Sequence, residues 1–114
     1  EVDNAIAQIN VVIELLNAIQ SRVAEVKKVI VNINERLFKQ LSNFEIVFNS
    51  KKDKNGFLNY ENLNETEKTL LMNTILLTKT LNKVLNTPIV DKQGSLSGDS
   101  KLVVDEGNNI LINL

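Results

Sequence analysis

The sequence of 114 residues contains no cysteine, no histidine and no tryptophan. Without cysteine there is no disulfide and no thiolate nucleophile, and without histidine the commonest general base and metal ligand are missing. Aromatic residues make up only 4% of the chain, which leaves little material for an aromatic-lined substrate pocket. We therefore expect a protein that is not an enzyme and that uses no cofactor and no metal ion.

An excess of charge of either sign is also absent. Thirteen Lys and Arg residues against fourteen Asp and Glu residues give a formal net charge of -1. No net field favours nucleic acid or an anionic membrane surface over other partners. With 43% apolar and 24% charged residues, the composition is typical of a single soluble domain. We expect a protein partner, either a second copy of the chain or another protein, no nucleic acid, and a membrane only as the less favoured alternative.

No apolar run is long enough to predict a membrane-spanning helix. The longest one, Ala5 to Ile19, is interrupted by Gln8, Asn10, Glu14 and Asn17, and it falls short of the roughly 20 apolar residues that cross a bilayer. The chain begins with Glu rather than Met, which indicates a processed product or a piece of a longer protein. The compartment stays open, with a secreted or cell-surface location slightly favoured.

A seven-residue apolar repeat runs through the first half of the chain. Neither glycine nor proline occurs between Asp3 and Asn49. One position of the repeat holds Val2, Ile9, Leu16, Val23, Ile30 and Leu37, and the other holds Ala5, Val12, Ile19, Val26 and Ile33. The pattern predicts one helix over about residues 3–49, roughly 70 Å long at 1.5 Å per residue.

The apolar face of this helix is wider than one partner helix requires. Only four residues form an unbroken polar stripe along it: Glu14, Ser21, Lys28 and Glu35. A helix with so narrow a polar face is typical of a bundle or coiled-coil assembly. The alternative is a helix that folds back on itself near residues 17–22, which would give a compact three-helix domain.

A second, shorter helix is predicted over about residues 64–86. Asn64 and Glu67 have the spacing of a capping box, and Pro88 ends the pattern. The apolar side of this helix is formed by Leu70, Leu71, Thr74, Leu77, Leu81, Val84 and Leu85. The fold class is therefore mainly α, with residues 1–87 forming a helical hairpin or bundle.

Residues 88–114 differ in composition and predict a Gly/Ser loop followed by a short β-hairpin. The β-branched runs 101–105 and 109–114 are separated by Glu106-Gly107-Asn108, which favours a turn. A lone hairpin is only marginally stable in water, so we expect it to pack on the helices or on a partner chain.

Two short motifs resemble known sites. The segment from Asp53 to Glu61 resembles part of an EF-hand loop around Gly56, but Lys51 and Asn62 would occupy its first and twelfth ligand positions. We therefore predict a helix-ending turn rather than a calcium site.

The segment 64–66 fits the N-glycosylation pattern, although the capping box explains the same residues. Glu61, Glu65 and Glu67 lie close together in sequence, but helix starts attract acidic residues without any catalytic role.

The sequence favours a non-enzymatic assembly or protein-interaction module. It would associate through the C-terminal strand and through the exposed apolar stripe formed by the two repeat positions of the first helix, which we call the seam. The residues that we expect to carry this interaction are Ile9, Val12, Leu16, Ile19, Val23, Val26, Ile30, Ile33, Leu37, Ile110 and Ile112. The alternative hypothesis is a secreted, membrane-active helical protein of the pore-forming kind, whose apolar face lies on or inserts into lipid.

Overall fold

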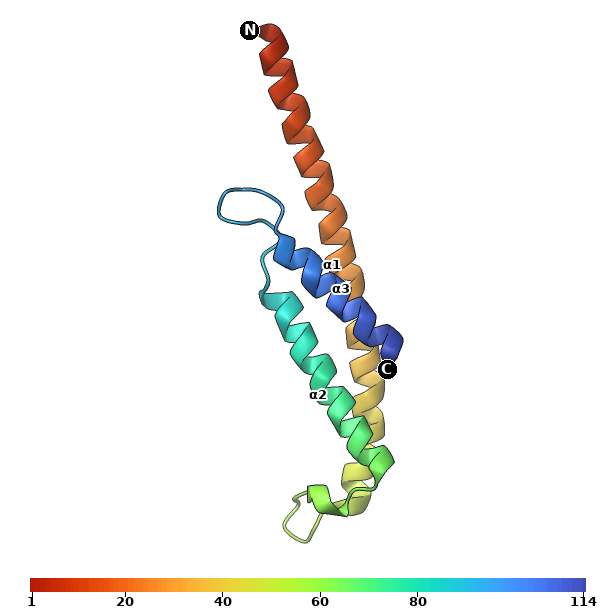
Figure 1. Ribbon diagram of the computed structural model, residues 1–114. Helices are drawn as coiled ribbons and strands as arrows, with labels where there is room; N and C mark the ends of the chain where they lie inside the picture. The colour runs from red at the N-terminus through yellow and green to blue at the C-terminus, as the bar shows by residue number, and fades with distance from the viewer.

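Three packed helices account for most of the chain in the computed structural model, which describes residues 1–114 (Figure 1). They are α1 (Val2–Lys51), α2 (Glu65–Asn86) and α3 (Gly98–Asn113), and one 3-10 turn, η1 (Tyr60–Asn62), precedes α2. The molecule is elongated, with extents of 78 × 23 × 17 Å. Helices α2 and α3 lie beside one part of α1, and the N-terminal part of α1 projects past them (Figure 1).

Helix α1 is continuous, as the absence of glycine and proline predicts. It begins at Val2 and ends at Lys51, so the fold-back near residues 17–22 does not occur. At its C-terminal end Lys52 is extended, and its N–H donates to the carbonyl of Phe48. The capping box of α2 is present, since the N–H of Glu67 donates to Asn64 Oδ1 and the N–H of Asn64 donates to Glu67 Oε1, both at 2.8 Å.

The predicted C-terminal β-hairpin is wrong, because residues 98–113 form α3 and no strand is found there. Ser97 caps this helix by accepting from the N–H of Ser100 at 3.2 Å. The buried residues Ser100, Val104 and Gly107 are spaced by four and three, which is a helical period. The β preference of short β-branched runs depends strongly on context, and here the packing against α1 and α2 overrides it.

All three helices contribute to one core. Buried apolar residues from α1 contact counterparts on the other two helices, and the cluster consists of Val29, Ile33, Leu37, Leu77, Val84 and Val104. Gly107, which we expected in a turn, lies inside α3 where that helix approaches α1 closely. A Cβ at this position would lie 2.7 Å from Val29 Cγ2, so the close approach depends on a glycine.

Candidate functional site

The projecting part of α1, residues 2–21, carries an apolar face that is exposed along most of its length, with only Leu15 and Ile19 half-buried; we call this segment the arm. Ile9 is 58% exposed, and Val12 and Leu16 are each 53% exposed. Other apolar residues of the arm are exposed as well: Val2, Ile6, Val11 and Ile13. Most soluble proteins avoid a contiguous apolar surface of this kind unless it binds something.

The structure divides the predicted interaction residues between two environments. Ile9, Val12 and Leu16 lie exposed on the arm, whereas Ile33 and Leu37 are buried in the chain's own core. The residues between these groups are half-buried: Ile19, Val23, Val26 and Ile30. On α3, Ile110 packs against the core, but Ile112 points outward and is 81% exposed. The seam of α1 is thus one continuous stripe that the molecule covers only in part.

Arg22 marks the boundary between the arm and the covered part of α1. Its Nη1 donates to the carbonyl of Ser97 at 3.0 Å and to Ser100 Oγ at 2.6 Å, which ties the start of α3 to α1. Its side chain is only 11% exposed, and its Nε also lies 3.9 Å from Glu25 Oε2. The apolar repeat gives no signal for Arg22; its only mark in the sequence is that it is the first basic residue of the chain and directly follows the arm.

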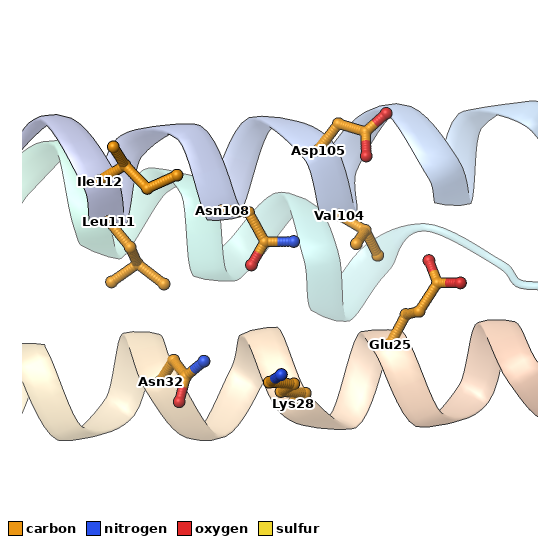
Figure 2. Close-up of a pocket in the computed structure, with 8 residues that line it drawn as sticks. All are labelled: Glu25, Lys28, Asn32, Val104, Asp105, Asn108, Leu111 and Ile112. Atoms are coloured by element: carbon orange, nitrogen blue, oxygen red, sulfur yellow. The ribbon is translucent and has the colours of Figure 1, made fainter.

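A shallow groove of about 570 Å³ lies between α1 and α3 (Figure 2). Its α1 side consists of Glu25, Lys28 and Asn32, and its α3 side is lined by Val104, Asp105, Asn108, Leu111 and Ile112. Asn108 points from α3 toward α1, whereas Asp105 turns outward (Figure 2). The groove brings together acidic, basic and amide groups and contains no hydroxyl group.

The segment that resembles an EF-hand loop forms a tight turn. Asp53 Oδ1 accepts from the N–H groups of Asn55 at 2.9 Å and Phe57 at 3.0 Å, and Gly56 has a φ of 81°. No group of three or more acidic residues in the structure is placed to hold a metal ion. The Asp53 carboxylate therefore stabilises the backbone of the turn that follows α1.

A second turn of the same kind lies before α3, within the region predicted only as a Gly/Ser loop. Asp91 Oδ1 accepts from the N–H groups of Gln93 and Ser95, both at 2.9 Å, and Gly94 has a φ of 84°. The shared pattern Asp-Lys-x-Gly at 53–56 and 91–94 is the signal that could have identified it. This turn leads directly into Ser97, so it sets the position at which α3 begins.

Glu67 joins the end of α1 to the start of α2, far from the arm. Its Oε1 accepts from Lys51 Nζ at 2.6 Å as well as from the N–H of Asn64. The hydrogen bond from Lys51, followed by that from the Asn64 backbone, lowers the pKa of the Glu67 carboxyl below its ordinary value of 4.5. Lys51 Nζ also donates to the carbonyl of Asn62 at 3.2 Å. This ion pair therefore fixes the hairpin between α1 and α2.

By length and composition alone, α1 also qualifies as a helix that can cross a membrane, and the qualifying window lies near the N-terminus with none of its residues buried. This differs from our expectation, which rested on the polar interruptions between Ala5 and Ile19. Soluble core helices and signal sequences meet the same criteria, so the arm is apolar enough for either a protein or a lipid environment.

The arm is the strongest candidate for a functional surface in this chain. Comparison with protein-family models, with curated proteins and with solved structures gave no match. Any functional conclusion therefore depends on the geometry of the chain itself.

Proposed function

We propose that this chain is a non-enzymatic helical assembly module, which associates with itself through the apolar face of the arm. The observation that carries the proposal is the continuity of the seam. In the covered part of α1 the repeat positions Val26, Ile30 and Ile33 pack against α2 and α3. The same positions continue into the arm as Ile9, Val12 and Leu16, where no helix of the chain covers them.

Two energetic arguments support a partner for the arm. Most of the stability of helices in proteins comes from packing of their apolar face rather than from helix propensity, so the arm gains from packing against a partner. If about 400 Å² of its apolar surface were buried at about 25 cal/mol per Å², the contribution would be about 10 kcal/mol before the costs of association. That amount is comparable to the stability of a whole domain.

The proposal is tested by sedimentation of the full chain between about 1 and 100 µM, since association follows mass action. We expect the wild type to shift toward a larger species as its concentration rises. The triple variant Ile9→Ser, Val12→Ser, Leu16→Ser removes the seam and should weaken association by about 100-fold or more.

A matched control replaces three exposed arm residues that lie off the seam: Ala7→Ser, Val11→Ser, Ala18→Ser. Because two of its changes replace Ala, the best helix former, it lowers helix propensity at least as much as the seam variant, but it should associate almost as well as the wild type. A wild-type chain that stays strictly monomeric at about 100 µM, with full helicity by circular dichroism, would overturn the proposal.

A second candidate function is membrane activity, which the exposed apolar arm also favours. Against it stand Glu14 and the amides Asn10 and Asn17, together with the absence of any basic residue before Arg22. Co-sedimentation with vesicles and dye release test this alternative with the same two triple variants. If the wild-type chain is monomeric in solution and releases dye, and the seam variant does not release dye, membrane activity would replace assembly as the function.

A further inference from the structure

We infer that the occupant of the arm face is one second copy of the chain, lying antiparallel, with the two arms in a single symmetric register. This inference rests on the proposed self-association and adds the orientation and the pairing. It follows from the spacing of the seam residues, from the charges beside them and from the position of the covered part of the molecule.

The seam of one arm can pack against the seam of an identical arm that runs in the opposite direction. In an antiparallel pair, each residue of one repeat position faces a residue of the other position on the opposite helix. Pairing Ile9 of one copy with Val12 of the other also pairs Ala5 with Leu16 and Val2 with Ile19. A two-fold axis relates the two copies, so each contact occurs twice. This register uses every seam residue of the arm, including Ile19, which is half-buried in its own chain, and stops before Arg22.

The positions that flank the seam contain no charged side chain within the arm. These residues are Ile6, Ile13 and Gln20 on one side and Gln8 and Leu15 on the other. Charges at such positions usually select a particular foreign partner or repel a second copy of the same chain. Here nothing opposes the pairing of identical arms, and the side chains of Ile6 and Ile13 extend the apolar surface.

The rest of the molecule favours the antiparallel over the parallel orientation. Beyond Arg22 the seam of each copy is covered by its own α2 and α3 (Figure 1). A parallel pair would bring both sets of covering helices to the same end of the paired arms and crowd them together. An antiparallel pair places them at opposite ends, so that the arms can pack along their whole length.

The orientation can be tested by disulfide trapping, because the natural chain contains no cysteine. Full-length chains carrying Ala5→Cys and Leu16→Cys are mixed in equal amounts and oxidised, and the products are separated without reductant. In the antiparallel register the two cysteines face each other, whereas identical cysteines lie about 16 Å apart, far beyond disulfide reach. We expect the mixed dimer to exceed either homodimer by about tenfold or more.

A parallel pair gives the opposite result, since identical cysteines are then neighbours and homodimers dominate. That outcome, in a chain that sediments as a dimer, would overturn the antiparallel inference and leave self-association intact. Sedimentation without any association would instead overturn the proposed function. The variant Val11→Cys lies off the seam and should form neither product, which controls for random collision.

Discussion

Ile9 and Ile30 occupy the same position of the seven-residue repeat, three repeats apart on one helix, yet their surroundings differ. Ile30 packs against the core that α1 forms with α2 and α3, whereas Ile9 is 58% exposed on the arm. The repeat determines which side of α1 is apolar, but it carries no information about what covers that side. Helices α2 and α3, with 22 and 16 residues, are too short to accompany a 50-residue helix along its whole length.

The largest expected difference between the two halves of α1 is in the stability of the single chain. Ile33 is fully buried, so Ile33→Ala should lower the free energy of unfolding by about 2–5 kcal/mol, through lost burial and a cavity. In the monomer Ile9→Ala should change it by less than about 0.5 kcal/mol. Urea denaturation at a chain concentration at least about tenfold below the dimer dissociation constant, where most of the chain is monomeric, measures both values. Equal effects would mean that the arm is covered within its own chain.

A smaller effect is expected where α3 approaches the covered half of α1. The methyl group of Gly107→Ala meets Val29 Cγ2, and overpacking costs about 1–3 kcal/mol, which exceeds the gain in helix propensity of about 1 kcal/mol. The net result should be a loss of about 1 kcal/mol in thermal or urea denaturation. Gly98→Ala is the control, because no atom lies within 4 Å of its added Cβ. A Gly107→Ala protein as stable as the control would show that Val29 moves aside easily.

The smallest effect concerns the ion pair that closes the covered end of the molecule. The pKa of the Glu67 carboxyl is lower in the folded chain than its ordinary value of 4.5. The ionised carboxylate therefore stabilises the fold above pH 4.5, and this stabilisation is lost as the pH falls through the folded pKa. Glu67→Gln should therefore be less stable than the wild type at neutral pH, and the difference should shrink in acid. Glu65→Gln is the matched control, since that carboxylate is 95% exposed. If the difference in stability between the Glu67→Gln variant and the wild type stays the same in acid, the effect comes from the capping hydrogen bond with the Asn64 N–H and not from the ion pair with Lys51.

The sequence predicted α1 and α2 well because their signals are local. An uninterrupted repeat defines α1, and a capping box at Asn64 and Glu67 fixes the start of α2. The signal for α3 is not local, since the choice between hairpin and helix depends on packing. Gly107 looks like a turn residue until Val29 is known to lie against it.

The candidate site was predicted only in part. The pattern identified the seam, but the sequence could not show that Ile33 and Leu37 would be used inside the chain while Ile9 and Val12 would not. That division depends on where α3 docks, which involves the core contacts of Val104, the close approach at Gly107 and the contact of Arg22 with Ser97. A single arginine is a weak signal without the tertiary structure.

The contacts at the two ends of the covered region also imply an order of folding. The pair of Lys51 with Glu67 closes a loop of 16 residues, whereas the hydrogen bond from Arg22 to Ser97 joins residues 75 apart. Short loops close at a lower entropic cost than long ones, so the contact between Lys51 and Glu67 should form before the contact between Arg22 and Ser97. We therefore expect the start of α3 to settle against Arg22 late in refolding, after the turn between α1 and α2 has formed. Until α3 docks, the seam of a new chain is exposed along more of α1 than the arm alone.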